Sequence, residues 1–144
     1  MMYLTDAQKA KFKEYRRIID GHIAMIVENP TEINNCVAAI RVWKAGQSYA
    51  RYDVRIDPAD NIPYWAMHDH SSIEGQELQP SLTPTIWAHY HGTTPETARP
   101  FIQEGHNPYM NGHYCIENGN IYLCGQDNIV YAPSVYPDAW TQVS

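Results

Sequence analysis

Several features that mark common classes of protein are scarce or missing in this 144-residue sequence. Only ten residues are Lys or Arg against sixteen Asp or Glu, and no basic run stands out beyond residue 43. A nucleic-acid partner is therefore not expected. No apolar run approaches the ~18 residues of a membrane span, and residues 1–11 lack the apolar core of a signal peptide. We expect no membrane partner, and synthesis in the cytoplasm.

Cysteine is also scarce. Cys36, Cys115 and Cys124 show no CxxC spacing, and an odd count does not make a complete disulfide framework. Cys115 and Cys124 fall on neighbouring predicted strands, so a disulfide between them and a pair of buried free thiols both stay open. The sequence favours free thiols.

Catalytic motifs are missing as well. The sequence contains no GxSxG, no HExxH, no phosphate-binding loop and no Cys–His pairing with supporting spacing. We predict that the protein is not an enzyme, that it has no catalytic residues and that it uses no cofactor.

The N-terminal third has a helical pattern. Residues 5–28 are predicted as a helix that begins with a capping box, Thr5 followed by Gln8. Large residues at 3-4-3-4 spacing form one stripe along it: Phe12, Tyr15, Ile19, His22 and Ile26. Two interpretations are open: the stripe packs on the protein's own body, or it forms a homo-oligomer through two heptads of coiled-coil spacing.

A second, shorter helix is predicted from Thr31 to about Val42, after a turn at Asn29-Pro30. Two helices joined by so short a turn form a helical hairpin. We assign residues 1–42 to this hairpin and expect it to serve in docking or oligomerisation.

From Trp43 onward, short Tyr/Ile/Val segments alternate with Gly, Asn, Asp and Pro, which is typical of small antiparallel sheets. The Asn118-Gly119 dipeptide predicts a tight hairpin, because both residues tolerate positive φ. Residues 92–99 form a polar linker. The predicted strands are Asp53–Ile56, Tyr64–His68, Ile86–His89, His113–Glu117, Asn120–Cys124 and Trp140–Val143.

The β region contains an internal repeat. Residues 43–92 and 100–144 share an aromatic opening, a Gly, a Tyr, a strand, a turn with a Tyr-led strand, a proline-bearing loop and a closing Trp. Each copy is small, so it needs packing against its twin and the helices for stability. The predicted fold class is α+β: an N-terminal helical hairpin followed by two small three-stranded antiparallel β modules.

The aromatic content is lopsided, with 11 Tyr and 4 Trp against 2 Phe. Strand aromatics are assigned to the core: Trp87, Trp140, Tyr64 and Tyr122. Aromatics in turns and loops are expected to be exposed, where their rings could stack on the apolar face of a sugar. These candidate carbohydrate-binding residues are Trp43, Tyr49, Tyr109, Tyr131 and Tyr136.

Two His-x-His pairs, His68/His70 and His89/His91, could each offer two imidazoles on one strand face. A metal-stabilised oligomer is therefore a further hypothesis. The favoured interpretation has no metal site: His70 is structural, and His89 and His91 are surface residues at a strand end.

The order of motifs resembles the chitin-binding type 3 modules carried by bacterial viruses and prophages. The first copy contains Trp-x-x-Gly-x-x-Tyr (Trp43, Gly46, Tyr49) and then Asp53-Val54, Tyr64, His70-Ser71-Ser72, Pro80, Pro84 and Trp87. The family's Gly before Asp is replaced by Tyr52. Leu78 stands where the family has a loop Trp, whereas the second copy has Tyr131 there. The second copy is therefore the expected binding copy.

The resemblance implies a non-catalytic carbohydrate-binding accessory protein of a phage tail or capsid, located in the virion after synthesis in the host cytoplasm. It would bind a cell-surface or mucus glycan polymer weakly through its exposed aromatics and gain strength from multivalency. Its N-terminal helices would contact other virion proteins. The alternative is a structural decoration protein of a phage particle, without affinity for sugars.

Overall fold

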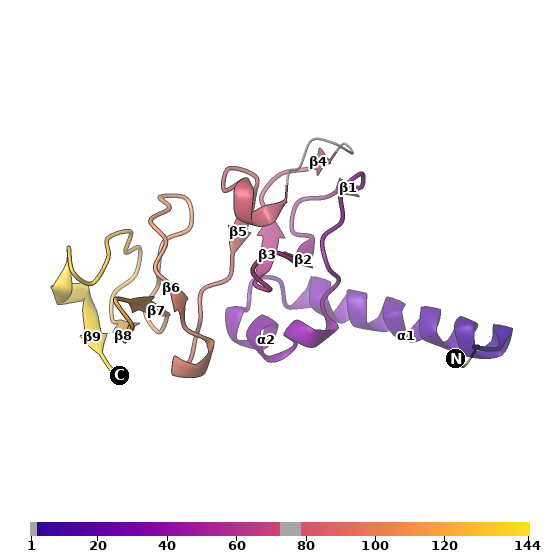
Figure 1. Cartoon of the computed structure of the whole chain (residues 1–144), viewed down its shortest axis with the longest axis horizontal. Helices are drawn as coiled ribbons and strands as arrows, with labels where there is room; N and C mark the ends of the chain where they lie inside the picture. The colour runs from indigo at the N-terminus through magenta and orange to yellow at the C-terminus, as the bar shows by residue number, and fades with distance from the viewer. Residues whose placement is uncertain (1–2, 73–78) are drawn as a thin grey trace.

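The computed structural model describes residues 3–72 and 79–144 and shows a mixed α and β architecture. One long helix, α1 (Asp6–Met25), extends away from a body that carries several small sheets. Figure 1 shows the N-terminus at the far end of α1 and the C-terminus at the opposite end of the molecule. The long axis therefore runs from α1 through a first β unit to a second one.

The predicted capping box of α1 is confirmed. The backbone N–H of Gln8 donates to Thr5 Oγ1 (3.1 Å), and the N–H of Thr5 donates to Gln8 Oε1 (2.9 Å). These bonds satisfy two N–H groups that helix geometry leaves unpaired. Helix α1 ends at Met25, three residues before the predicted end at residue 28.

The second predicted helix is much shorter than expected. Helix α2 (Pro30–Asn35) is followed by a single 3₁₀ turn at Val37–Ala39. Asn29 caps α2 by accepting the N–H of Glu32 (3.1 Å). The helix cannot reach Val42, because this residue is already extended and forms a bridge with Ile56. Tertiary pairing thus overrides the helical spacing of residues 36–42.

The first β unit has a three-stranded antiparallel sheet in the order β2 (Val54–Ile56), β3 (Pro63–Ala66), β5 (Trp87–His89). All three strands were predicted, within two residues at each end. Strands β1 (Ser48–Tyr49) and β4 (His70–Ser71) form an additional two-stranded pair. These two-residue strands are too short to show the alternation of apolar and polar residues that predicts a strand from sequence. A 3₁₀ turn at Pro80–Leu82 precedes β5.

The second β unit has a four-stranded sheet in the order β6 (Arg99–Pro100), β7 (Tyr114–Glu117), β8 (Asn120–Cys124), β9 (Trp140–Gln142). The last three strands are antiparallel and were predicted; β6 lies parallel to β7 and was not. The predicted hairpin turn is confirmed by positive φ at Asn118 (53°) and Gly119 (79°). A 3₁₀ turn at Pro137–Ala139 leads into β9.

The segment 92–99 is a compact turn. Gly92 forms a bridge with Tyr114, and a 3₁₀ turn at Pro95–Thr97 follows with a capping box between Thr94 and Thr97. A Cβ at Gly92 would lie 2.3 Å from the carbonyl oxygen of Thr97. Only glycine fits at position 92, a steric requirement that the polar composition of the segment does not indicate.

Among the residues that the structure describes, the buried hydrophobic side chains form three clusters. In the first, the helices pack on β2 and Tyr90, whose hydroxyl donates to the carbonyl of Val27 (2.6 Å). The other two clusters lie inside the first and second β units. Their members are Ile23, Ile26, Ile33, Ile40, Val54, Ile56 and Tyr90; Trp43, Tyr49, Tyr64, Ala66 and Trp87; and Tyr109, Cys115, Cys124, Ile129, Ala139 and Trp140.

Corresponding aromatic pairs lie at the centre of the two β units. The rings of Tyr49 and Trp87 meet edge to face with centroids 5.3 Å apart, at an interplanar angle of 73°. Those of Tyr109 and Trp140 are 5.2 Å apart at 68°. In each unit a backbone N–H donates to the tyrosine hydroxyl: Lys44 to Tyr49 (2.9 Å), and Ile102 to Tyr109 (3.1 Å).

The turn before the first long strand is also alike in the two units. Tyr52 and Gly112 both adopt positive φ, 74° and 95°. The N–H of Tyr52 donates to Ala66 (2.7 Å), and that of Gly112 donates to Cys124 (2.9 Å). Two further hydrogen bonds correspond: Arg51 N–H to Asp69 Oδ1 (2.7 Å), and Asn111 N–H to Asp127 Oδ1 (3.0 Å).

The cysteines are all free, as the sequence favoured. Cys115 and Cys124 are fully buried in the second β unit. Burial raises the pKa of the Cys115 thiol to about 12 and raises that of Cys124 as well. Both are therefore protonated, unreactive core residues at neutral pH.

Candidate functional site

Three of the five candidate sugar-binding aromatics are buried, so the expectation that they are exposed is wrong. Trp43 and Tyr49 lie in the core of the first β unit, and Tyr109 lies in that of the second. Their positions in turns suggested exposure. In units whose strands have two to five residues, however, the strands alone cannot fill a core, and turn aromatics fill it instead.

The polar tips of the buried tyrosines are satisfied by the backbone. The Tyr49 hydroxyl accepts the N–H of Lys44 and donates to its carbonyl, both at 2.9 Å. Burial raises the pKa of Tyr109 above its usual value. These rings hold the turns together and have no free face to offer a ligand.

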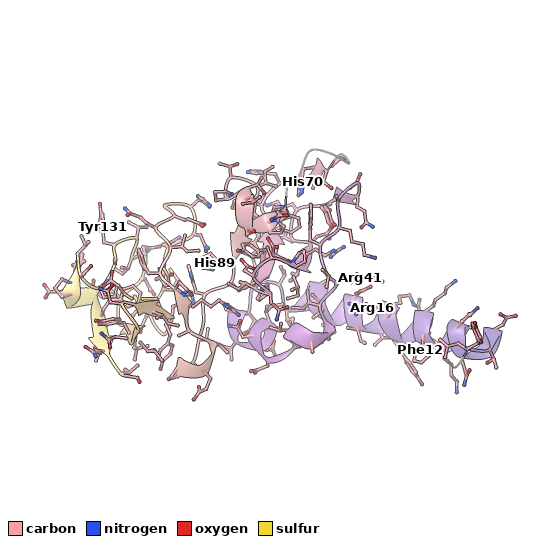
Figure 2. All side chains as sticks on the ribbon, viewed as in Figure 1. Phe12, Arg16, Arg41, His70, His89 and Tyr131 are labelled. Carbon is pink, nitrogen blue, oxygen red and sulfur yellow. The ribbon has the colours of Figure 1, made fainter. Side chains whose placement is uncertain are left out.

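The other two candidates are exposed, as expected. Tyr131 is 48% exposed and Tyr136 is 39% exposed, in the loop between β8 and β9. Figure 2 shows Tyr131 on the outer side of the second β unit. The Trp140 indole N–H donates to the Tyr131 carbonyl (3.0 Å), and the N–H and hydroxyl of Ser134 donate to the Glu117 carboxylate (2.9 and 3.0 Å). The loop that presents the two rings is therefore anchored to β9 through Tyr131 and to β7 through Ser134. Leu78, the counterpart of Tyr131, lies outside the described residues.

An aromatic residue that the sequence reasoning did not select occupies an unusual position. Tyr52 is 41% exposed although its φ of 74° is disfavoured for a bulky side chain. Its ring stacks on Trp65 with centroids 5.7 Å apart and planes 20° apart, and the Arg51 guanidinium lies 4.8 Å from its centroid. The feature of the sequence that could have drawn attention to this residue is the replacement of the family's Gly by Tyr52.

Tyr52 and Trp65 line a cavity of about 250 Å³ where the helices and both β units meet. The helical segment contributes one wall, the first β unit a second and the second β unit a third. The lining residues are Val27, Glu28, Pro30, Tyr52, Trp65, His89, Tyr90, His91, Asn107 and His113.

Two hydrogen bonds through Asn107 connect the β units beside this cavity. The Asn107 side-chain amide donates to the carbonyl of His89 (2.9 Å), and His91 Nε2 lies 2.9 Å from the carbonyl of Asn107. Arg99 adds a third tie, since its guanidinium donates to Tyr90 and to Asn34 Oδ1. The junction is thus built from specific polar contacts.

His89 and His91 are buried at this junction, so their assignment to the surface is wrong. Figure 2 places His89 where the first β unit meets the second. The two imidazole rings are perpendicular with centroids 4.6 Å apart, and His91 stacks on Tyr109 at 3.7 Å. The sequence showed a strand end, but the second unit covers that end.

Burial keeps these imidazoles neutral. It lowers the pKa of His89 to about 4 and that of His91 to about 2, and it also lowers the pKa of His113. A neutral imidazole has one N–H and one bare nitrogen. We place the protons on His91 Nε2, facing Asn107, and on His89 Nδ1, 3.3 Å from the Tyr90 carbonyl. Neither His91 Nδ1 nor His89 Nε2 has a partner among the described residues.

Within residues 3–72 and 79–144, no group of three or more His, Cys, Asp or Glu side chains is arranged to hold an ion. His70 packs against Tyr49 and Trp87, and its Nδ1 lies 2.8 Å from the carbonyl of His68. Its structural role is confirmed. Since His89 and His91 are buried, they cannot be shared between subunits.

A polar cluster ties α1 to the body. Arg16 and Arg41 both donate to the Asp20 carboxylate, at 2.5–2.9 Å, and Arg16 also donates to the carbonyl of Ala39 (2.7 Å). Figure 2 shows the two arginines side by side at the base of the projecting helix. Partial burial raises the pKa of Asp20, but the hydrogen bonds from the two arginines outweigh it and hold that pKa below its usual value.

Comparison with protein-family models and with curated proteins found no match to this chain. In the part of the chain that the structure describes, no helix is both long and apolar enough to cross a bilayer.

Proposed function

We propose that residues 43–92 and 100–144 are two copies of one β module, preceded by a helical hairpin. The support is the agreement in detail between the two units. Both contain an edge-to-face Tyr–Trp pair, and both place a positive-φ residue in the same hydrogen-bonded turn. The duplication then explains why a module of about 45 residues is found packed against a second one.

The function we propose is weak glycan binding by a non-catalytic accessory protein of a phage particle or prophage. The observation that carries it is the pair of exposed rings, Tyr131 and Tyr136, on the anchored loop of the second unit. A ring face stacks on the apolar C–H face of a sugar. Residues 100–144 contain four Asp or Glu and no Lys or Arg, which favours neutral glycans over anionic polymers.

Each stacked ring supplies about 0.5–1.5 kcal/mol beyond the area that it buries. A single site built on two such rings is expected to bind with a dissociation constant of ~1 mM. Useful attachment to a cell surface or to mucus then requires many copies on one particle. This fits a virion location, in which the N-terminal helices contact other particle proteins.

The test is binding of the full chain to a glycan array and to insoluble polysaccharides. We expect Tyr131→Ala or Tyr136→Ala to weaken binding roughly fivefold each, which corresponds to about 1 kcal/mol per ring. Tyr3→Ala is the matched control, because Tyr3 is exposed on the N-terminal segment, remote from the loop. Absence of binding to every polymer at high protein concentration would refute the proposal.

A structural role without sugar affinity is the second candidate, and the outer half of α1 favours it. Phe12, Tyr15 and Ile18 are all more than half exposed there, whereas Ile23 and Ile26 pack on the body. The stripe is therefore divided: its end packs on the protein itself, and its beginning is uncovered (Figure 2 labels Phe12). A helix with no support over its outer half is only marginally stable in water.

The partner that best fits this outer half is a second copy of the chain. Helix α1 holds five of the ten Lys and Arg residues but only three of the sixteen Asp and Glu. The remainder of the chain is correspondingly acidic, so a basic helix of one copy and the acidic body of another attract each other. Such an assembly would make a decoration protein of a phage particle.

A further inference from the structure

The chain passes from the first β unit to the second at a residue that carries a buried imidazole. On one side, Tyr90 is held by the first unit, because its N–H donates to the carbonyl of Pro63 (3.0 Å) and its ring is buried in the helical cluster. On the other side, the carbonyl of Gly92 accepts the N–H of Tyr114 (2.8 Å) in the second unit. His91 alone lies between these two anchors. A residue in this position can absorb the change of backbone angles when two bodies reorient.

The contact between the two units is mainly polar. Among the described residues, no hydrophobic cluster has buried members on both sides of residue 91. The units meet through the hydrogen bonds of Asn107 and Arg99 and through the stacking of His91 on Tyr109. A typical hydrogen bond contributes roughly tenfold or less to an equilibrium constant. The junction can therefore separate without dismantling the core of either unit.

A protonated imidazole has no place in the closed junction. His91 Nδ1 and His89 Nε2 are buried and lack a partner among the described residues. A proton on either nitrogen creates an N–H donor without an acceptor and a positive charge that water does not reach. The surroundings add to this cost: the ring of His91 lies 4.6 Å from that of His89 and 5.3 Å from that of His113, and Arg99 disfavours the charged forms.

The acidic groups nearby do not compensate for this cost. Asp127 favours protonation of His113, but burial outweighs it and the pKa of His113 is lowered. Glu104 is paired with His106 at 3.3 Å, and burial raises its pKa. Burial also raises the pKa of the neighbouring tyrosines, so they stay neutral in acid. The other titratable groups near the junction include Glu28, Asp60, Tyr64, Tyr90 and Tyr109.

We propose that this junction is an acid-operated hinge, in which protonation of His89 and His91 separates the two β units while each keeps its own fold. Figure 2 shows His89 where the units meet. In the open form both imidazoles reach water, which hydrates the charge. The second unit, with the exposed Tyr131, then moves freely relative to the helices. This device is independent of sugar binding, so the two proposals stand or fall separately.

The expected size of the effect follows from proton linkage. An imidazole in water has a pKa of about 6.5. Below that pH, each histidine that is neutral in the closed form and protonated in the open form raises the opening constant by about tenfold per pH unit. Two such histidines raise it about 10⁴-fold between roughly pH 6.5 and 4.5. A change of about 10⁴-fold converts an equilibrium of roughly 1:99 to 99:1, so we expect a steep transition in this interval.

The experiment is an NMR titration of the full chain from about pH 7.5 to 4.5, with far-UV circular dichroism. The nuclear Overhauser contact between the His91 and Tyr109 rings reports on the junction, because their centroids lie 3.7 Å apart. The indole N–H signals of Trp87 and Trp140 report on the two cores separately. We expect the ring contact to vanish reversibly in this interval while both indole signals persist. Separate reporters are needed because units this small are near the limit of independent folding.

Two variants and a control sharpen the test. Asn107→Ala removes the bond to the His89 carbonyl but no titratable group. Loss of a bond that contributes roughly tenfold should move the midpoint towards neutral pH by about half a unit, because two protons are linked to opening. His89→Gln removes one linked proton and should make the transition shallower. His68→Gln removes an exposed imidazole and should change neither midpoint nor steepness.

Three results would overturn the inference. The first is a ring contact that persists to pH 4.5 in the native chain. The second is loss of an indole signal together with the ring contact, which would mean that acid unfolds a unit instead of opening the junction. The third is an Asn107→Ala midpoint equal to that of the native chain. This last comparison also decides the matter if His89→Gln does not fold.

Discussion

The two neutral histidines at the junction make the fold sensitive to mild acid. In the folded chain, burial lowers the pKa of His89 to about 4 and that of His91 to about 2, whereas an unfolded imidazole has a pKa near 6.5. Arg99 also disfavours the charged forms. Between these values the unfolded chain binds more protons than the folded chain, so lowering the pH favours unfolding.

The magnitude follows from the fraction of imidazole that is protonated. At a pH of about 5.5 an unfolded imidazole is roughly nine-tenths protonated, which stabilises the unfolded state by about 1.4 kcal/mol per histidine. Two histidines that stay neutral in the fold thus lower the free energy of unfolding by about 3 kcal/mol relative to pH 7.5. The stability that the two neutral histidines contribute is fully present above the pKa of the unfolded imidazole. It is lost as the pH falls from that value towards the lower pKa of the folded state.

The assay is urea unfolding followed by tryptophan fluorescence at pH values of about 7.5, 6.5 and 5.5. We expect the free energy of unfolding to fall steeply over this range. His91→Gln should lower stability at neutral pH but reduce the pH slope, because one of the three histidines whose pKa burial lowers, His89, His91 and His113, is gone. His68→Gln, which removes an exposed imidazole, is the control and should leave the slope unchanged. A free energy of unfolding that stays constant from pH 7.5 to 5.5 would refute the reasoning.

Two further predictions concern backbone fit and assembly. Gly92→Ala should destabilise the chain by about 2 kcal/mol or more, because its Cβ would meet the Thr97 carbonyl at 2.3 Å. Gly21→Ala, with open space around its position in α1, should instead stabilise by about 0.5–1 kcal/mol; equal effects in urea unfolding would contradict the steric argument. If α1 joins two copies, light scattering of the native chain should show an oligomer that a Phe12→Ser, Tyr15→Ser double variant converts to a monomer. A native chain that is monomeric at high concentration would rule out self-assembly through this helix.

Local signals in the sequence were strong enough to predict most of the elements. The capping box at Thr5, the hairpin turn at Asn118-Gly119 and the six longer strands were found from capping, turn and strand patterns. Each of these features depends on residues that are close together in the chain, so a short stretch of sequence is enough to predict it. The elements that were missed are two-residue strands and the early end of α2, which exist only through pairing with distant segments.

The candidate site was predicted less well, and the reason is burial. Position in a turn suggested exposure for Trp43, Tyr49 and Tyr109, but in so small a unit the turns supply the core. The same logic placed His89 and His91 at the surface, because the sequence cannot show that a second unit covers the end of β5. Burial is a property of the whole assembly of segments, not of any one segment.

What the sequence determined by itself was the repetition of an aromatic β pattern after a helical segment, and the departure of Tyr52 from the glycine of the family it resembles. Only the tertiary structure decided which aromatic rings are free to bind. It exposed Tyr131 and Tyr136 on the loop between β8 and β9 and buried Trp43, Tyr49 and Tyr109 in the cores of the two β units. It also formed a cavity that Tyr52 and Trp65 line. Three parts of the chain form the walls of that cavity. No local sequence pattern can predict it, because it forms only when those parts pack together.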